Sequence, residues 1–485
     1  MKKTQSLLAL SLSILLGSTS FAQTLQAGFD KQEYTDMMKI SARFGDSAYY
    51  SNLPVPGQYH FEYRSPIVGL DNCWDLWISD NRIGIISIRG TTVNSVSWLA
   101  NFYAAMVPAK GELHLGKKDE FKYELASDPK AAVHVGWLVS TAFLSKTIVP
   151  KIDSCRKAGI KEFIIIGHSQ GGAIAYLLTA HLNQLKKQNT IASDIRFKTY
   201  CSAAPKPGNL YFAYEYENLT QNGWAYNVVN SADWVPEVPV TIQTLKDYNN
   251  TNPFMHAETI IKEQKFPTKL VLKKIYRKLD KPTKRAQKNY QKYLGKLASK
   301  MVKGNIKGYR SPKYYPSNHY VRTGNTIVLY ADESYYKAFP ENPSMLFNHH
   351  FHQPYLYLTD KLQYTLNDKP NSSSPLSGSW ELEYLYGVND FNALYSSRKP
   401  KIDLNSSSLN ISGNTSCNSF SGNFILNGNN IGFSSSMAMT KMFCEGEGEI
   451  KFLEALAKVK GYFVTDGKTL TMVADGVTIM RFKRI

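Results

Sequence analysis

The segment that most constrains how this chain can fold spans residues 161–172 and reads KEFIIIGHSQGG. Its apolar run predicts a buried strand, and residues 172–185 carry a helical pattern of apolar positions. Between the two, the glycines of Gly167-His168-Ser169-Gln170-Gly171 permit a tight turn that raises the Ser169 hydroxyl above the strand end. A serine hydroxyl becomes nucleophilic once a base takes its proton. The motif therefore predicts nucleophilic catalysis by Ser169.

The remainder of the chain shows two different patterns of predicted secondary structure. Apolar runs rich in β-formers, such as residues 83–88 and 163–166, alternate with helical patterns, as in βαβ units around a mostly parallel sheet. From residue 380 onward, short strands such as 409–412 and 423–426 are separated by Asn, Gly and Ser turns, with one helical stretch at 449–459. We therefore expect an α/β domain followed by a small, mostly β domain.

Five segments of the first domain together resemble the class 3 (fungal-type) lipase family, which has the α/β-hydrolase fold. They are GHSQG around Ser169, ISIRGTTVNSVSW at 86–98, HVGW at 134–137, YCSAAPKPGN at 200–209 and VVNSADWVPEVP at 228–239. The resemblance implies that the backbone N–H of Thr91 stabilises an oxyanion. The start of the helix after Ser169 adds the N–H of Gln170.

The same resemblance implies a carboxylate at Asp233 and, because this fold orders its triad Ser, Asp, His, a histidine further along the chain. The family places its base before a final helix, often as His-x-x-Tyr, and the match is His352-Gln353-Pro354-Tyr355. We expect His352 to be the base, with His350 and His349 as alternates. The three histidines have no Cys or carboxylate at ligand spacing beside them, so we expect no metal and no cofactor.

The N-terminus has the features of a cleaved secretory signal. Lys2 and Lys3 precede a leucine-rich stretch at 7–16, and small residues end at Ser20-Phe21-Ala22, so we expect cleavage after Ala22. No Cys follows the apolar stretch, so we expect no lipid anchor. The protein is predicted to be secreted or periplasmic, in an oxidising compartment where thiols can pair.

The positive charge of the chain is concentrated in one segment. The 485 residues hold 57 Lys and Arg against 39 Asp and Glu, a net charge of +18. Residues 262–313 contain 18 Lys and Arg and two acids, which gives 18 − 2 = +16. Removal of Lys2 and Lys3 with the signal also leaves +16, so the rest of the mature chain is neutral. The charge therefore does not support a nucleic-acid partner.

Apolar spacings within residues 262–313 predict two amphipathic helices joined near Lys281 and Pro282. Such a basic insertion is either a solvated surface hairpin or a site for an anionic membrane or cell-surface polymer. Its ends should emerge near the rim of the active site, because it lies between the acid and the base.

A second apolar series follows the predicted oxyanion residue Thr91. By the family resemblance it is expected to form a lid, and the alternative is an ordinary core-facing helix. It comprises Val96, Trp98, Leu99, Phe102, Tyr103 and Met106.

The C-terminal residues resemble the META domain, a module whose biochemical role is poorly defined. The resemblance rests on Gly378-Ser379-Trp380, on CNSFSG at 417–422 and on Thr440, Met442, Phe443 and Cys444. Cys417 and Cys444 either pair or remain two buried thiols, and Cys155 and Cys201 are expected to be buried. The predicted organisation is a signal at 1–22, a hydrolase at 23–366 with the insertion at 262–313, a linker at 367–376 and a META-like domain at 377–485.

Together these features predict an exported serine carboxylic ester hydrolase, a lipase acting on acylglycerol or related lipid esters through an acyl-enzyme. The alternative is an envelope binding or adhesion protein whose hydrolase domain is vestigial. A complete catalytic set in fold order favours the enzyme, because a vestigial site has little reason to retain it.

Overall fold

The computed structural model describes residues 25–252, 257–362, 376–406, 408–427, 430–434, 437–465, 467–474 and 477–485. These form two compact units whose boundary falls between residues 366 and 367. The predicted signal at 1–22 and all but the last residue of the predicted linker lie outside the described residues. Within the described ranges, no helix combines the length and the apolar character that a membrane span requires.

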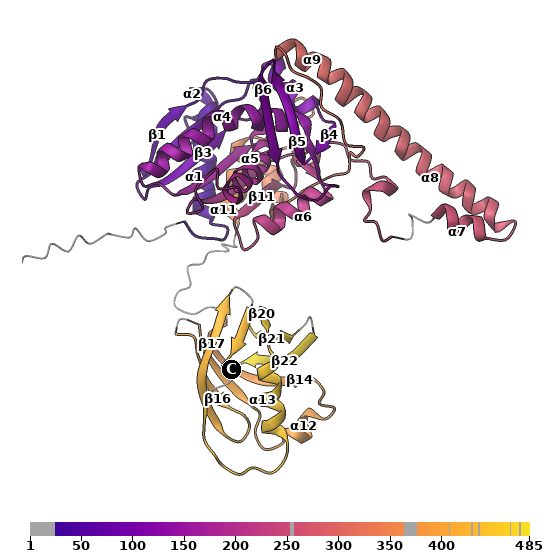
Figure 1. Ribbon diagram of the computed structural model, residues 1–485. Coiled ribbons are helices and arrows are strands. Elements are labelled where there is room, and N and C mark those ends of the chain that lie inside the picture. The colour runs from indigo at the N-terminus through magenta and orange to yellow at the C-terminus, as the bar shows by residue number, and fades with distance from the viewer. Residues whose placement is uncertain are drawn as a thin grey trace, which may run out of the picture. The chain divides into compact units, whose positions relative to one another are not determined.

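A seven-stranded sheet organises the first unit (Figure 1). Its first three strands pair antiparallel, and every later pairing is parallel. In sheet order the strands are β1 (Tyr59–Arg64), β2 (Trp74–Ser79), β3 (Ile83–Ile88), β8 (Glu162–His168), β9 (Arg196–Ser202), β11 (Ala225–Asn230) and β13 (Asn325–Leu329). The predicted strands at 83–88 and 163–166 are confirmed.

Helices cover both faces of this sheet, so alternate residues of each central strand enter different cores. Ile165 packs into the core that holds α4 (Val135–Lys157) and α5 (Gln170–Lys187). Ile164 and Ile166 pack into the core that holds α1 (Lys31–Ser41) and α11 (His352–Lys361). Burial on both faces explains why the strand is an unbroken apolar run rather than an alternating one.

Smaller elements flank the sheet. A four-stranded sheet has the order β12 (Tyr320–Val321), β10 (Gly208–Asn209), β7 (Ala132–His134) and β4 (Met106–Pro108), and β5 (Lys110–Gly116) pairs with β6 (Asp119–Glu124). The remaining helices before the insertion are α2 (Ser47–Tyr50), α3 (Ser95–Phe102) and α6 (Leu210–Leu219). Short helical turns lie at η1 (Ala42–Phe44), η2 (Val235–Glu237) and η3 (Leu245–Asp247), and α10 (Glu333–Ala338) follows the last strand.

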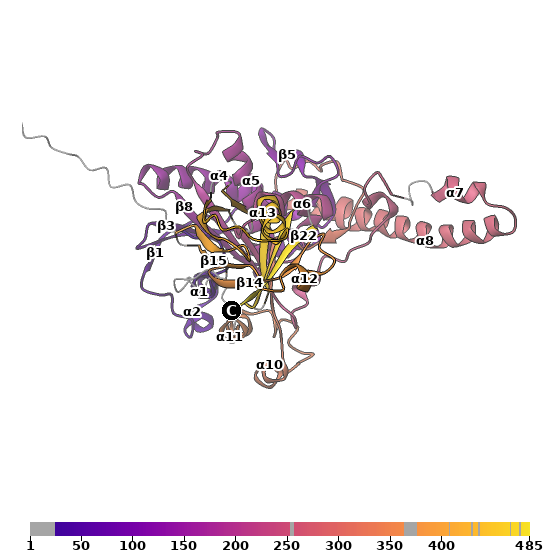
Figure 2. The ribbon, with the colours of Figure 1, turned by 90° about the horizontal axis from the view of Figure 1, so that it is seen from below.

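The basic insertion forms a long helical arm. It comprises α7 (Ala257–Glu263), α8 (Thr268–Gln291), the π-helical segment η5 (Lys292–Leu297) and α9 (Ala298–Asn305). In both views α8 extends away from the sheet with α7 beside it (Figures 1 and 2). The prediction that two helices meet near Lys281 and Pro282 is wrong, because α8 runs through both residues. Pro282 has no N–H to donate to the carbonyl of Lys278, four residues earlier. Lys278 is exposed, so water can satisfy that carbonyl.

The second unit is a nine-stranded antiparallel sheet. Pairing between β16 (Asn410–Asn414) and β17 (Ser419–Asn427) joins strands far apart in the sheet order and closes it on itself. The enclosed core holds Trp380, Leu382, Phe420 and Phe482, with Phe452 from α13 (Gly448–Lys458). The other elements are β14 (Gly378–Leu385), α12 (Phe391–Leu394), β15 (Lys401–Asn405), β18 (Asn430–Phe433), β19 (Ala438–Met439), β20 (Gly461–Thr465), β21 (Thr469–Ala474) and β22 (Val477–Arg484).

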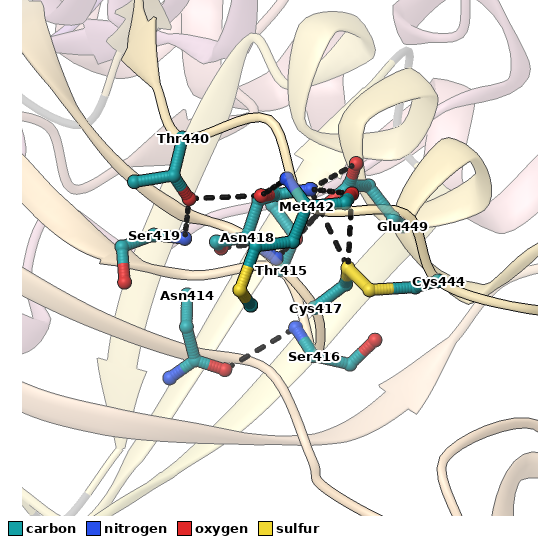
Figure 3. The surroundings of a disulfide bond; sticks show 10 residues. All are labelled: Asn414, Thr415, Ser416, Cys417, Asn418, Ser419, Thr440, Met442, Cys444 and Glu449. Carbon is teal, nitrogen blue, oxygen red and sulfur yellow. Dashed lines mark hydrogen bonds between the residues drawn. A yellow bond between two sulfur atoms is a disulfide. The ribbon is translucent and has the colours of Figure 1, made fainter.

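Cys417 and Cys444 form a disulfide beside a buried asparagine (Figure 3). The Asn418 amide donates to the Met442 carbonyl at 3.1 Å and to a Glu449 carboxylate oxygen at 3.1 Å, and its oxygen accepts from the Met442 N–H at 2.7 Å. Covalent and polar contacts thus fasten the same two loops. Cys73, Cys155 and Cys201 are free and buried, as expected for the last two.

Replacing Cys417 and Cys444 together by serine is expected to lower the free energy of unfolding of the second unit by roughly 3 kcal/mol. The bond closes a loop of 27 residues and restricts the unfolded chain. Urea unfolding of the variant, compared with the wild type with and without reductant, measures the loss. An unchanged midpoint would show that the Asn418 contacts alone hold these loops.

Candidate active site

The turn that carries Ser169 has the strained backbone of a nucleophile elbow. Ser169 connects β8 to α5 and adopts φ 61° and ψ −129°, a region that L-residues rarely occupy. Its N–H donates to the Ser202 carbonyl on the neighbouring strand β9 at 2.9 Å. A strained conformation that the flanking elements impose is typical of a functional position.

Close backbone contacts explain the glycines on either side of the serine. A Cβ on Gly167 would lie 2.1 Å from the Gly171 carbonyl oxygen, and one on Gly171 would lie 2.3 Å from the Ile88 carbonyl oxygen. Neither distance is tolerable between non-bonded atoms. The glycines therefore permit the tight packing of the turn against itself and against the end of β3.

Asp233 lies after β11, at the same carboxyl edge of the sheet as Ser169, and is paired with His350. One carboxylate oxygen of Asp233 accepts from His350 Nδ1 at 2.7 Å and from the Tyr355 hydroxyl at 2.8 Å. The other accepts from the Val235 N–H at 3.0 Å. Burial and the nearby carboxylate raise the pKa of Tyr355 well above its usual value, so its hydroxyl stays a donor. The contact with Asp233 therefore holds Nδ1 of His350 and orients its ring.

The histidine expected to be the base, His352, contacts different groups. It is the first residue of α11; its Nδ1 lies 2.8 Å from the Tyr49 hydroxyl and its Nε2 lies 3.3 Å from Ser41 Oγ. Burial lowers its pKa to about 3, so the ring is neutral. Asp233 is thus paired with the alternate, His350. His350 lies in the loop just before α11, whereas His352 is already part of that helix. His349 Nδ1 lies 2.8 Å from the Tyr335 hydroxyl.

His168, next to Ser169, connects the turn to the loop that carries His350. Its Nε2 donates to the His350 carbonyl at 2.7 Å, which leaves Nδ1 to accept from Ser202 Oγ at 3.1 Å. Ser202 Oγ in turn lies 2.7 Å from the Tyr34 hydroxyl. Burial lowers the pKa of His168 well below its usual value, which favours the neutral ring that this arrangement needs. The motif histidine therefore positions the backbone of His350.

Asn101 on α3 organises the side of the site that contains the predicted oxyanion residues. Its amide donates to Thr91 Oγ1 at 3.0 Å, and its oxygen accepts from Gln170 Nε2 at 2.9 Å and from Trp137 Nε1 at 3.0 Å. Because Asn101 donates to the Thr91 hydroxyl oxygen, the Thr91 proton is directed to another acceptor. The N–H of Gln170, at the first position of α5, has no intrahelical acceptor.

One cavity of about 920 Å³ connects these groups. Ser169, His350, Thr91 and Gln170 all line it. Most of the other lining residues are apolar or aromatic, among them Phe44, Trp98, Phe102, Trp234, Val240 and Phe347. Tyr290 and Leu294, from the C-terminal part of the arm, also line it, so the insertion reaches the active-site rim.

The apolar series after Thr91 divides between two environments. Leu99, Tyr103 and Met106 are buried, whereas Trp98 and Phe102 line the cavity and Phe102 is exposed. Trp98 packs on Phe347 with ring centroids 6.1 Å apart, and Phe347 packs on Trp234 at 5.4 Å. One face of α3 thus belongs to the core and another forms an aromatic wall near His350.

The contacts missed by sequence reasoning come from distant segments. Asn101 carries one signal, a polar residue in an otherwise apolar helical series. Tyr49 carries none, because it precedes its partner His352 by 303 residues. In the sequence, Tyr355 is recognisable only as part of the His-x-x-Tyr pattern. In the structure it contacts the carboxylate, and the histidine of that pattern stacks on His168 with ring centroids 4.4 Å apart.

The Nδ1 atoms of the three neighbouring histidines contact three different side chains, those of Tyr335, Asp233 and Tyr49. Among the described residues, one group could hold a metal ion: Glu112, His114 and Glu120 on the β5–β6 hairpin. These residues do not line the cavity. The cavity is lined by Ser169 and by His350, which is paired with Asp233. A serine with a histidine–carboxylate pair is the set that acyl transfer uses.

A mostly parallel sheet with a strained serine elbow and a histidine–aspartate pair at one edge defines an α/β-hydrolase. Residues 85–243 match the family model "Lipase (class 3)", and residues 374–484 match the META domain. Both resemblances seen in the sequence are confirmed by these matches.

Two curated proteins are similar over 172 residues, each at 26% identity. One is secreted mono- and diacylglycerol lipase 1 of Fusarium solani, with 35% of this chain and 42% of the relative covered. The other is the chloroplastic phospholipase A1-Ialpha2 of Arabidopsis thaliana, with 32% of each covered. The chain thus spans less than half the length of these relatives.

Solved structures that resemble the chain include two fungal lipases. The Rhizomucor miehei lipase propeptide complex is 20% identical, with a TM-score of 0.32 over 44% of this chain and 65% of the other. The Lip2 lipase of Yarrowia lipolytica is 18% identical, with a TM-score of 0.32 over 45% and 79%.

Proposed function

We propose that this protein is an exported serine ester hydrolase that cleaves lipid esters through an acyl-enzyme on Ser169. The observation that carries the proposal is the shared cavity, in which the strained Ser169 and the Asp233-paired His350 lie among apolar walls. Class 3 lipase similarity over residues 85–243 supports the same reaction class.

In this mechanism His350 Nε2 takes the Ser169 proton as Oγ attacks the ester carbonyl. Negative charge develops on the carbonyl oxygen, toward which we assign the N–H groups of Thr91 and Gln170. Collapse of the tetrahedral intermediate expels the alcohol, which receives the proton from His350. A water molecule, deprotonated by His350, then attacks the acyl-enzyme and releases the carboxylic acid and free Ser169.

The cavity supports a substrate with a long apolar part. Its volume of about 920 Å³ is at the upper end of small-molecule sites, and the walls near His350 are aromatic. The relatives' names include acylglycerol and phospholipid hydrolases, so we place the substrate among lipid esters. We also place α3 as a lid, since the exposed Phe102 suits contact with lipid.

Export is part of the proposal. It rests on the charge, apolar and small-residue order of residues 1–22, and the Fusarium relative is described as secreted. Because residues 262–313 are strongly basic, we expect an anionic surface to be a partner of the protein.

The decisive experiment combines a p-nitrophenyl ester series, from acetate to palmitate, with labelling by a fluorophosphonate. We expect wild-type protein to hydrolyse the series and to carry one phosphonyl adduct on Ser169, located by mass spectrometry. The Ser169→Ala variant should lose both signals. Equal rates for wild type and variant would instead favour a binding or adhesion protein with a vestigial hydrolase domain.

A further inference from the structure

The arm has an apolar stripe that no part of its own unit covers. Val271, Ile275 and Leu279 recur every four residues on α8 and are exposed to 55%, 51% and 68%. Phe266, in the turn between α7 and α8, is exposed to 79%. On the same helix, which α7 contacts, Leu272 and Tyr276 are only half-buried. A surface helix that packed on the core of a globular domain would bury such a stripe.

The rest of the helix surface is strongly basic. Residues 268–291 contain nine Lys and Arg and a single acid, Asp280. Asp280 is already neutralised by Lys284, whose Nζ lies 2.7 Å from the carboxylate. In the described part of the chain, Lys284 is the one α8 cation within salt-bridge distance of a carboxylate. The other eight cations are left to attract an anionic partner.

The inner end of the same arm is built into the catalytic unit. Val302 in α9 belongs to the main core, as do Ile306 and Tyr309 just after it. The Leu294 carbonyl accepts from the Ala105 N–H at 3.0 Å. Tyr290 and Leu294 line the cavity that contains Ser169. The arm therefore starts at the cavity wall and carries its basic, apolar-striped part outward (Figure 1).

We propose that α8 docks this protein on an anionic lipid bilayer, with Val271, Ile275 and Leu279 inserted among the acyl chains and the flanking lysines on the headgroups. A basic amphipathic helix with an exposed apolar face is the form that lies in a membrane interface. A polyanionic polymer would neutralise the lysines and leave the apolar stripe in water. The bilayer satisfies both faces and also contains the lipid esters that the cavity is proposed to take. The inference thus rests on the proposed function and adds the surface from which the substrate enters.

Two variants of the full-length protein separate the two contributions. The stripe variant carries Val271→Ser, Ile275→Ser and Leu279→Ser, and the charge variant carries Lys273→Gln, Lys274→Gln, Arg277→Gln and Lys278→Gln. A control removes the same charge elsewhere, through Lys117→Gln, Lys118→Gln, Lys187→Gln and Lys337→Gln, all exposed residues outside the arm.

Vesicle flotation measures the docking, with phosphatidylcholine alone or mixed with phosphatidylglycerol. We expect wild type and control to bind the anionic vesicles, and both arm variants to bind at least about tenfold more weakly. High salt should weaken wild-type binding, because it screens the headgroup charge. Binding to dextran sulfate should be retained by the stripe variant and lost by the charge variant.

Two results would overturn the inference. Wild-type binding to anionic vesicles that the stripe variant retains in full would identify α8 as a polyanion site, and equal binding by all four proteins would remove any role for the arm. Hydrolysis of p-nitrophenyl butyrate, which is soluble, should be the same in all four. If the wild type fails that assay, the proposed function is wrong, whatever the vesicles show.

Discussion

Replacing His350 by alanine is expected to lower kcat/KM for p-nitrophenyl butyrate by about 10⁴-fold or more, because no other group would take the Ser169 proton. The expectation rests on the 2.7 Å contact between His350 Nδ1 and Asp233, which leaves Nε2 available in the cavity. Steady-state kinetics with the soluble ester measures the loss without any effect of surface binding.

His352→Gln is the matched control. It replaces a neighbouring buried histidine that contacts Tyr49 and Ser41, and we expect its kcat/KM to fall by less than about tenfold. Melting curves should show that both variants are folded. A 10⁴-fold loss in His352→Gln together with an active His350→Ala would reassign the base to His352.

Asp233→Asn should lower kcat by about 10⁴-fold with little change in the structure. An amide presents an N–H₂ group where the carboxylate accepts from His350 Nδ1, so it favours the tautomer that carries its proton on Nε2. That tautomer cannot accept from Ser169. The loss should appear in kcat for soluble esters of every acyl length.

Tyr355→Phe tests the same carboxylate oxygen by a smaller change. It removes the 2.8 Å hydrogen bond to Asp233 and leaves the charge in place, so we expect a loss of roughly tenfold. If Tyr355→Phe and Asp233→Asn were equally inactive, the tyrosine would contribute more than orientation. If Asp233→Asn kept wild-type kcat, Asp233 would not be the catalytic acid.

Local patterns in the sequence predicted most of the fold. Residues 161–185 carry their own strand, turn and helix signals, so the elbow could be predicted without knowledge of its neighbours. The same holds for the helix predicted at 449–459, observed as α13. The predicted break at Pro282 was wrong because a proline destabilises an exposed helix by only a few kcal/mol. The strong helix formers on either side can offset that cost.

The site was harder to predict because its partners meet only after folding. The sequence NHHFH offers three histidines within six residues of Tyr355, and local spacing cannot show where the loop ends and α11 begins. Contacts with Tyr49, Asn230 and His168 decide which ring meets the carboxylate. Asn101 likewise acts through three residues that lie apart in the sequence.

The hydrogen bond from His168 to the His350 carbonyl has a consequence for how the protein tolerates change. The main chain of His350 is attached to the residue beside Ser169, so the spacing of His350 and Ser169 depends little on residues 340–345. That stretch is irregular and mostly exposed. Its length and composition can therefore vary, by natural drift or by engineering, and reshape the entrance for bulkier or more polar esters while the proton-transfer geometry is preserved.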